Sequence, residues 1–220
     1  MADISHTYYD DSYFSWQSPG GLLSARLDCW KFEPFLTGND VVLDFGCGGG
    51  YMLAALDCGA RYGVEINPAA RKEAERCINV YPEIEQLPRD VAFDVVISHH
   101  ALEHVDHPLE VLQKLRARLK PSGRIVFVVP SEEWRKEEHY RADDINQHLY
   151  TWTPLLLGNL FSRAGYHVER CELLRHRWLP KSSIFYRMMP SSVFHFLCRV
   201  WGTIVGSRQI RIVASRLTTN

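Results

Sequence analysis

The 220-residue sequence lacks the cysteine spacings of zinc sites and redox centres. None of its six cysteines forms a Cys-x-x-Cys pair, and no Cys/His cluster has the spacing of a structural zinc site. Scattered single cysteines are typical of reduced, buried thiols in the cytosol. We therefore expect a cytoplasmic protein that binds no metal ion.

Targeting and membrane-spanning segments are also missing from the pattern. The N-terminus is acidic and aromatic, without the basic and apolar regions of a secretory signal. The longest apolar stretch, near 193–205, is interrupted by His195 and Arg199, so we expect no transmembrane helix. The 46% hydrophobic content is enough for one substantial core, and the length favours one domain.

Acidic residues are absent after Glu172, although the net charge of the chain is only −1. A segment with this composition either attracts an anion or forms a solvated basic face. Its eight basic residues are Arg175, Arg177, Lys181, Arg187, Arg199, Arg208, Arg211 and Arg216.

What the chain does contain is an alternation of apolar strand-like runs and helical segments. The expected strands are 41–45, 61–66, 78–81, 93–98, 124–129, 166–174 and 209–215. The expected helices are 22–35, 53–56, 69–77, 108–119 and 154–164. Such alternation predicts an α/β fold with a single doubly wound, mostly parallel seven-stranded sheet and helices on both faces.

The pattern divides the chain into four parts. We expect an N-terminal aromatic arm and helix (1–36), a cofactor-binding core (37–175), a basic, apolar insert (176–207) and a last strand (208–220).

The sequence VVLDFGCGGG places a glycine loop between a buried strand and a helix. Glycines at such a turn let the backbone pass close beneath a ligand. Glu65 ends the next expected strand, 19 residues after Gly46. A carboxylate there can accept hydrogen bonds from both ribose hydroxyls of an adenosine ligand.

Three details separate this loop from other nucleotide sites. The dinucleotide pattern requires a small residue at position 51, where the chain has Tyr51. The Gly-Lys-Ser/Thr of a P-loop is absent. Asp44, two residues before Gly46, is unsuited to a pyrophosphate but suits an ammonium group. S-adenosylmethionine has an ammonium, a sulfonium and no phosphate, so we predict it as the cofactor.

These residues resemble the class I S-adenosylmethionine-dependent methyltransferases. VVLDFGCGGG resembles that family's first motif and YGVEIN its second, and FDVVISHHALEHV with HPLEVLQKLRARLKPSGRIVFVVP resembles its small-molecule subgroup of types 11 and 23. The resemblance covers roughly 40–175 and implies a Rossmann-like methyltransferase fold.

The resemblance also implies cofactor contacts. The loop of Gly46, Cys47, Gly48 and Gly50 would lie under the methionine part, and Asp44 would orient the ammonium. Glu65 would bind the ribose, Ile66 would pack on the adenine, and Ser98 and His99 would face the sulfonium. The family's usual acid after the third strand is replaced by YPEIEQLP, which leaves Glu83 or Glu85 for the adenine amino group.

Histidines supply candidates for a catalytic base, because imidazole titrates near neutral pH. The candidates are His99, His100, His104 and His148, of which we favour His100 or His148. The alternative is that these rings only bond to backbone groups, and His104 is as well suited to fixing its loop as to chemistry.

For each of two further segments the sequence allows two alternative roles. Tyr8, Tyr9, Tyr13, Phe14 and Trp16 form either a lid over the cofactor or a surface-packed arm. A helical apolar stripe in the insert is either core or a face that rests on an anionic membrane. The stripe comprises Val193, Phe196, Leu197, Val200, Trp201 and Ile204.

For the acceptor we expect a small molecule, or an anionic sugar or lipid-linked sugar of bacterial envelope synthesis, with the enzyme in the cytoplasm or peripherally at the inner membrane face. The short basic tail, the acidic net charge and the lack of an Asn/Asp-Pro-Pro-Tyr motif argue against a nucleic-acid partner. An RNA methyltransferase and a partner-dependent cofactor-binding subunit are the alternatives. The sequence does not determine the oligomeric state.

Overall fold

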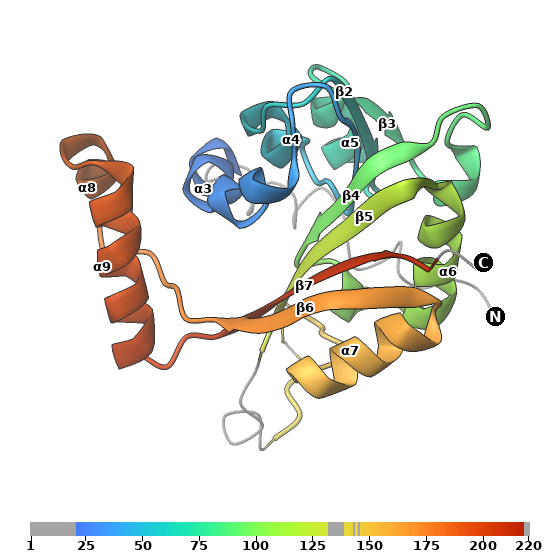
Figure 1. Cartoon of the computed structure of the whole chain (residues 1–220). Helices are drawn as coiled ribbons and strands as arrows, with labels where there is room; N and C mark the ends of the chain where they lie inside the picture. The colour runs from blue at the N-terminus through green and yellow to red at the C-terminus, as the bar shows by residue number, and fades with distance from the viewer. Residues whose placement is uncertain (1–20, 132–138, 143, 145, 218–220) are drawn as a thin grey trace.

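The computed structural model describes residues 21–131, 139–142, 144 and 146–217. A seven-stranded sheet crosses the centre of the molecule in the order β3-β2-β1-β4-β5-β7-β6 (Figure 1). Its strands are β1 (Val41–Phe45), β2 (Ala60–Val64), β3 (Asn79–Tyr81), β4 (Phe93–His99), β5 (Leu119–Pro130), β6 (Tyr166–Leu174) and β7 (Gln209–Arg216). The predicted mostly parallel, seven-stranded α/β sheet is confirmed, and β7 runs antiparallel to both β5 and β6.

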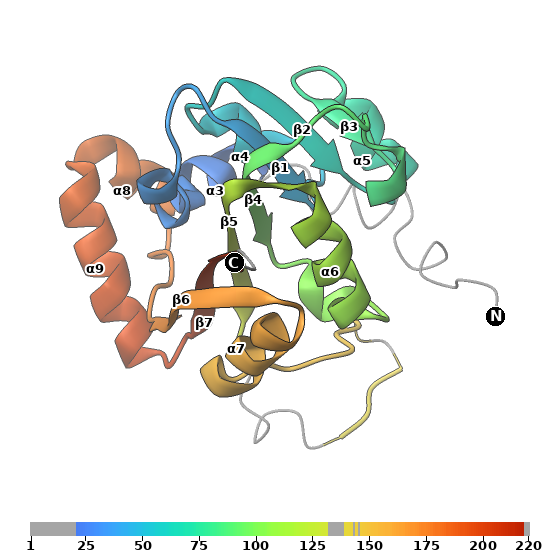
Figure 2. The same ribbon diagram turned by 45° about the vertical axis from the view of Figure 1, so that its right-hand side comes forward.

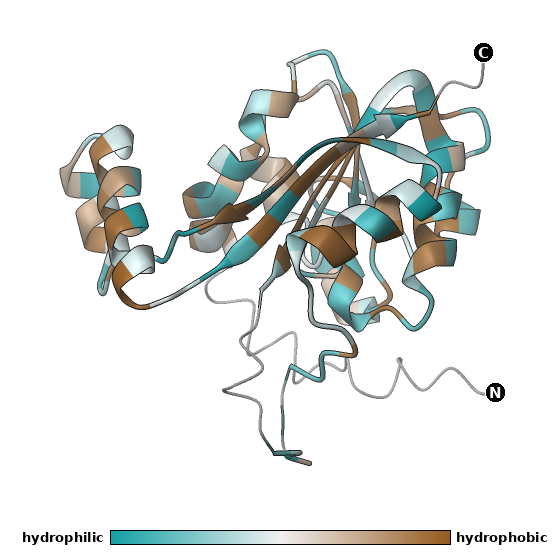
Figure 3. Cartoon of the chain, turned by 60° about the horizontal axis from the view of Figure 1, so that its bottom comes forward, coloured by the Kyte–Doolittle hydropathy of each residue, from teal (hydrophilic) through white to brown (hydrophobic). Residues whose placement is uncertain are grey.

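Helices cover both faces of this sheet (Figure 2). The helices α4 (Tyr51–Ala55) and α5 (Pro68–Ala74) cover one face, and α6 (Pro108–Arg118) and α7 (Pro154–Arg163) cover the other. Strand side chains alternate between two apolar clusters, so that Val42 faces α4 and α5 while its neighbour Leu43 faces α6 and α7. Burial on both faces explains why the central strands are continuous apolar runs (Figure 3).

Strand β5 begins five residues earlier than the sequence predicts. Leu119 was expected to end a helix and 120–123 to form a turn, but Leu119 pairs with Phe93 at the start of β4. Lys120 Nζ also lies 2.7 Å from Asp94 Oδ2, which fixes the extended segment beside β4. A cross-strand ion pair thus extends the strand beyond its apolar part.

The single helix expected over 22–35 is wrong. Helix α3 covers only Gly21–Asp28, and two short 3₁₀ helices follow, Cys29–Lys31 and Glu33–Phe35. Pro34 lies in the second of these and has no N–H for a continuing α-helix. The tighter turns direct the side chain of Lys31 inward, where it is 1% exposed.

Between β6 and β7 the chain forms α8 (Ser182–Met188) and α9 (Ser191–Ile204), which stand beside α3 (Figure 1). The face of α9 that packs inward carries Phe194 and Cys198, which join Leu27 of α3 in a small apolar cluster. The expected core role of the Val193–Ile204 stripe is therefore wrong, because most of that stripe points outward. Its exposed members are Val193, Phe196, Leu197, Val200 and Ile204.

No helix among the described residues combines the length and the apolar character that crossing a membrane requires.

Candidate active site

A cavity of about 760 Å³ opens at the carboxyl ends of β1, β2 and β4. Strands β1 and β4 are neighbours in the sheet, yet the chain leaves β1 toward β2 and returns to the other side with β4. Ligands of open α/β sheets bind at such a reversal of strand order. The loop after β1, the ends of β2 and β4, helix α3 and Trp178 all contribute walls.

The glycine loop after β1 needs its glycines for different reasons. Gly46, Gly48 and Gly50 all have positive φ, at 72°, 52° and 76°. A Cβ on Gly46 would lie 2.4 Å from Ala101 Cβ, and one on Gly50 3.2 Å from Ala74 Cβ, so both positions are closely packed. A Cβ on Gly48 would meet nothing within 4 Å, and Gly48 lines the cavity.

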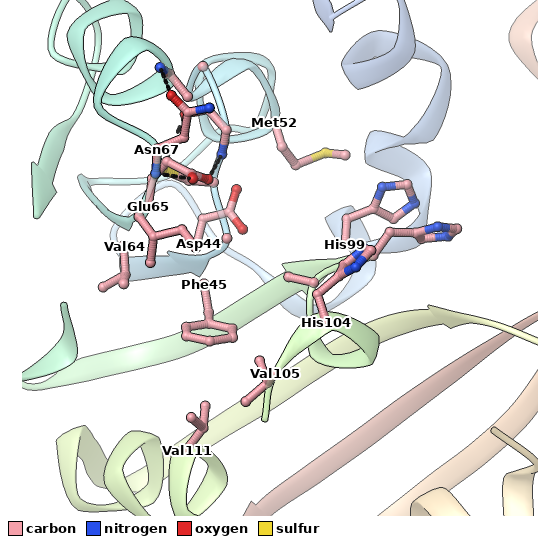
Figure 4. A pocket seen from close by; sticks show the side chains of 18 of the residues that line it. Asp44, Phe45, Met52, Val64, Glu65, Asn67, His99, His104, Val105 and Val111 are labelled. Carbon is pink, nitrogen blue, oxygen red and sulfur yellow. Dashed lines mark hydrogen bonds between the residues drawn. The ribbon is translucent and has the colours of Figure 1, made fainter. Parts of the chain in front are cut away.

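Glu65 ties this loop to the second strand. Its Oε2 accepts a hydrogen bond of 2.9 Å from Gly48 N, and its Oε1 accepts one of 2.8 Å from Asn67 N. Asn67, which the sequence analysis missed, also caps α5 by accepting from Ala69 N and Ala70 N. The carboxylate of Glu65 is therefore held in one orientation at the cavity wall (Figure 4).

Asp44 is the second acid of this wall, and it is buried, with 3% of the residue exposed. Burial raises the pKa of Asp44 well above its ordinary value, and the nearby Glu65 raises it further. Burial also raises the pKa of Glu65, and the hydrogen bonds from Asn67 N and Gly48 N oppose this. The buried carboxyl of Asp44 and the half-buried carboxyl of Glu65 together favour a ligand that brings positive charge.

The rest of the cavity wall also carries negatively charged side chains. Its acidic residues are Asp28, Asp44, Glu65, Glu83, Glu85, Asp106 and Glu110. Among the described lining residues Lys114 is the one lysine or arginine, and its Nζ lies 2.6 Å from Glu85 Oε1. A polyphosphate is disfavoured here and a cation is favoured.

Apolar side chains line one end of the same cavity, among them Val64, Ile66, Ile84 and Val111. Cys47 also lines it, and its sulfur packs so closely on β2 that a Cβ on Gly63 would lie 2.5 Å away. Glu83 and Glu85 both reach this end, although Glu85 is engaged by Lys114.

His99 lies across the cavity from the two acids (Figure 4). Its Nε2 lies 2.9 Å from Lys31 Nζ, and Lys31 in turn lies 3.0 Å from Asp28 Oδ1. Burial lowers the pKa of His99 well below its usual value, and the charge of Lys31 adds to this. Sequence analysis missed Asp28 and Lys31, because nothing in CWKFEPF shows that the lysine turns inward.

Ser98 does not line the cavity, contrary to the expectation that it would face the sulfonium. It is 1% exposed, and its Oγ donates a hydrogen bond of 2.7 Å to Phe45 O on the neighbouring strand. Alternation along β4 turns Ser98 away from the side on which His99 emerges. Its geometry is that of a link between β4 and β1.

His100 lines the cavity in a left-handed conformation, with φ of 56°. Its backbone N donates to Val128 O at 2.8 Å, and its Nε2 is buried with no hydrogen-bond partner among the described residues. Burial lowers the pKa of His100 well below its usual value, with further lowering by His99. The ring is therefore neutral at pH 7 and able to accept a proton.

His148 is not a lining residue, although His104 is. The two rings lie 4.8 Å apart between centroids, so His148 stands behind His104 as seen from the cavity. The structure thus brings His100, His104 and His148 to one region, but places only the first two at the cavity surface.

Residues 23–170 match the model of a family described as a methyltransferase domain. The chain belongs to the class I S-adenosylmethionine-dependent methyltransferases. The expected family, enzyme class and cofactor are thereby confirmed.

Relatives of this methyltransferase act on different acceptors. It is 37% identical over 197 residues to the tRNA U34 carboxymethyltransferase of Shewanella woodyi, covering 74% of this chain and 59% of that protein. It is 32% identical over 151 residues to the mitochondrial ubiquinone biosynthesis O-methyltransferase of Schizosaccharomyces pombe, covering 57% and 51%. The chain thus spans little more than half the length of these relatives.

The fold of this methyltransferase is also found in solved structures. A SAM-dependent methyltransferase from Archaeoglobus fulgidus superimposes with a TM-score of 0.65 at 20% identity, covering 94% of this chain and all of that one (100%).

The argument against a nucleic-acid partner is wrong. Curated relatives named as tRNA U34 carboxymethyltransferases overturn it, including one from Histophilus somni at 30% identity over 190 residues. The shortness of the basic tail and the net charge of −1 were therefore weak evidence against an RNA partner. The expected envelope-sugar acceptor and membrane contact gain no support from these relatives.

The expected lid of the methyltransferase lies outside the described residues. Tyr8, Tyr9, Tyr13, Phe14 and Trp16 all precede Gly21, where the described part of the chain begins.

Proposed function

We propose that this methyltransferase transfers the methyl group of S-adenosylmethionine to a nucleoside of tRNA. The relatives named for tRNA modification support the acceptor. The observation that carries the cofactor assignment is the pair of carboxyls, buried Asp44 and half-buried Glu65, which share one cavity wall with the glycine loop.

In this proposal, residues of the cavity wall contact each part of the cofactor. Asp44 binds the ammonium and Glu65 binds the ribose hydroxyls, with Gly46, Cys47 and Gly48 beneath the methionine part. Ile66 packs on the adenine, and Glu83 receives its amino group because Glu85 is engaged by Lys114. Gly50 supports the loop from outside the cavity by its close packing on Ala74.

The exposed basic residues of a segment that also contributes to the cavity wall suit the phosphates of RNA. Six basic residues of the 175–208 segment are exposed: Arg175, Arg177, Lys181, Arg187, Arg199 and Arg208. Trp178 of the same segment lines the cavity and donates to Asp28 Oδ1 at 3.2 Å. Phosphate contacts position a nucleic acid, and an adjacent pocket receives the reacting base.

Methyl transfer requires the acceptor atom to lie in line with the bond between the methyl carbon and the sulfur. Such positioning contributes about 7–11 kcal/mol to lowering the barrier. His100 is the proposed base, because its neutral ring lines the cavity. His148 acts on this region through His104 instead of touching the acceptor.

The acid wall also bears on which group is transferred. A carboxymethyl donor would bring an extra carboxylate into a cavity whose lining carries seven acidic residues and one lysine. We therefore propose a methyl group as the unit transferred by this chain.

The test measures tritium transfer from methyl-labelled S-adenosylmethionine to total tRNA, to ribosomal RNA and to a small-molecule extract. We expect ribonuclease-sensitive label in tRNA only, and its loss in Glu65→Gln. Label in the small-molecule extract alone would contradict the proposal. Unlabelled carboxy-S-adenosylmethionine should compete weakly, and strong competition would contradict the choice of methyl group.

A charge-reversed pair tests the RNA surface. Lys181→Glu with Arg187→Glu should weaken tRNA binding and lower its dependence on salt, because fewer counterions are released. Arg89→Glu, an exposed residue outside the cavity lining, is the matched control and should have little effect. Equal effects of both changes would contradict a localised RNA surface.

A further inference from the structure

A group of potential metal ligands lies behind the His104 wall of the cavity. Glu103 and His104 belong to the 3₁₀ helix Leu102–His104 that follows β4, and His148 lies in the segment before α7. One ligand atom from each of the three residues lies within 4.8 Å of the others. We propose that Glu103, His104 and His148 bind a divalent transition-metal ion.

The spacing of the three groups is close to that of a bound site. Bonds of about 2.0–2.2 Å in a tetrahedral site place ligand atoms roughly 3.5 Å apart. The observed group therefore needs to contract by only about 1 Å, which small rotations of the side chains supply. Glu103 is 0% exposed, so its carboxylate is already withdrawn from bulk water.

Backbone hydrogen bonds hold the two ligand-bearing segments together. Leu149 N and Tyr150 N both donate to Glu103 O, at 2.9 Å and 3.3 Å. The Tyr150 hydroxyl donates to Asp106 O at 2.9 Å. His148 therefore reaches the 3₁₀ helix because its neighbours are bonded to it. Such outer contacts orient metal ligands before an ion binds.

The His104 ring is oriented in the way that metal-binding histidines usually are. A hydrogen bond with the Gln147 backbone fixes one of its ring nitrogens. A metal-binding histidine characteristically donates one ring N–H to a carbonyl and offers the other nitrogen to the ion.

The donor set indicates the class of metal. Two imidazoles with one carboxylate favour zinc, ferrous iron or cobalt, whereas magnesium and calcium prefer sites made of oxygens. Three protein ligands leave a further position open in sites of the catalytic kind. His104 is the member that also lines the cavity, so the proposed ion lies next to the cavity wall.

This inference rests on the proposed function for its chemical role. An acceptor hydroxyl oxygen bound to the ion would lose its proton more readily. The oxygen then forms a bond to the methyl carbon, while the carbon–sulfur electron pair goes to sulfur. The products are the methylated acceptor, S-adenosylhomocysteine and a proton released to solvent.

The test uses the whole chain, freed of metal with a chelator and titrated with Co²⁺ while its visible absorption is recorded. We expect one equivalent to bind, and Zn²⁺ to displace it. His148→Ala and Glu103→Gln should each weaken Co²⁺ binding at least tenfold. His167→Ala, an exposed residue outside the cavity lining, is the matched control and should bind as the parent does.

A variant that adds a new absorption band distinguishes loss of the metal site from failure to fold. His148→Cys should bind Co²⁺ and add a thiolate-to-cobalt charge-transfer band in the near ultraviolet. Binding of S-adenosylhomocysteine identifies the folded variants, since His148 lies outside the cavity lining. The inference is overturned if the parent binds no Co²⁺, if no substitution weakens binding, or if the cysteine variant binds without that band.

Metal binding and tRNA methylation can fail separately. Full tRNA methylation by chelator-treated enzyme would overturn the metal site and leave the proposed function intact. Stoichiometric Co²⁺ binding at these residues without any tRNA methylation would support the metal site and contradict the proposed function.

Discussion

The Nζ atom of Lys31 lies 2.9 Å from the Nε2 atom of His99. A lysine ammonium can only donate, so Nε2 of His99 accepts and its ring proton lies on Nδ1. Burial lowers the pKa of Lys31, and Asp28 Oδ1, 3.0 Å from Lys31 Nζ, opposes this by favouring the charged lysine. The ring of His99 is thus held in one tautomer at the cavity, with its Nε2 occupied.

Replacing this lysine should change the titration of His99. The charge of Lys31 contributes to lowering the pKa of His99, so Lys31→Met should raise that pKa, although burial still keeps it below the usual value. Lys31→Arg keeps the charge and should leave the pKa low. Histidine C–H resonances followed by NMR against pH measure both variants. An unchanged His99 titration in Lys31→Met would contradict the contact.

Two glycines of the same loop should respond differently to alanine. Gly46→Ala combines positive φ with a contact of 2.4 Å to Ala101 Cβ and should cost about 2–4 kcal/mol of unfolding free energy. Gly48→Ala has strained φ but open space, and should cost only about 1–2 kcal/mol. Urea unfolding measures both.

The two glycine variants should also separate stability from cofactor binding. A methyl group at position 48 enters the cavity, so Gly48→Ala should weaken S-adenosylhomocysteine binding by more than its stability loss suggests. Undiminished binding to Gly48→Ala would show that the cofactor does not approach this part of the loop.

Arg211 and Arg170 provide a matched test of one carboxylate. Arg211 Nη2 lies 2.6 Å from Glu172 Oε1, and its Nη1 donates to Lys31 O at 3.0 Å, with 10% of the side chain exposed. Arg170, 60% exposed, lies 3.8 Å from the same oxygen. Arg211→Met should cost about 1–3 kcal/mol of unfolding free energy, because the partner Glu172 is partly solvated. Arg170→Met should cost less than about 0.5 kcal/mol, and equal losses in chemical denaturation would be unexpected.

Cofactor binding should release protons below neutral pH. The pKa of Asp44 is raised in the empty cavity, and the cationic ligand stabilises the ionised form, so binding lowers that pKa again. Affinity should therefore rise with pH from above the ordinary value of 3.8 and level off once Asp44 is ionised. Calorimetry in buffers of different ionisation enthalpy counts the protons.

A substitution of Glu65 provides a second test of the Asp44 titration. Glu65→Gln removes the charge that further raises the pKa of Asp44, and should reduce the proton release. Affinity that does not depend on pH in the parent chain would argue against Asp44 as the partner of the ammonium.

Asp44→Asn should separate stability from binding. A carboxyl whose pKa is raised in the folded state destabilises the folded chain as pH rises from its ordinary pKa through the folded-state pKa, so Asp44 destabilises the cofactor-free chain at pH values above 3.8. The asparagine should raise the Tm of the cofactor-free chain by roughly 2–4 °C at pH 7.5 and weaken cofactor binding. Thermal unfolding with and without S-adenosylhomocysteine measures both, and a lower Tm would contradict the cost of burial.

The sequence alone determined the sheet and the acidic wall of the cavity. Strands buried on both faces are continuous apolar runs, and glycines with an acid at each of two strand ends mark a loop whose positions follow from covalent order. Asp44 and Glu65 could be paired because parallel neighbouring strands end at the same edge.

Only the tertiary structure decided what lies opposite that wall. The inward turn of Lys31, the outward stripe of α9, the side on which Ser98 emerges and the approach of His148 to Glu103 depend on contacts between segments far apart in the chain. Periodicity identifies an apolar face but not which neighbour covers it, and a histidine in a loop has no spacing rule that predicts its partner. The acidic side of the cavity could therefore be predicted from the sequence, whereas the histidine side could be identified only from the fold.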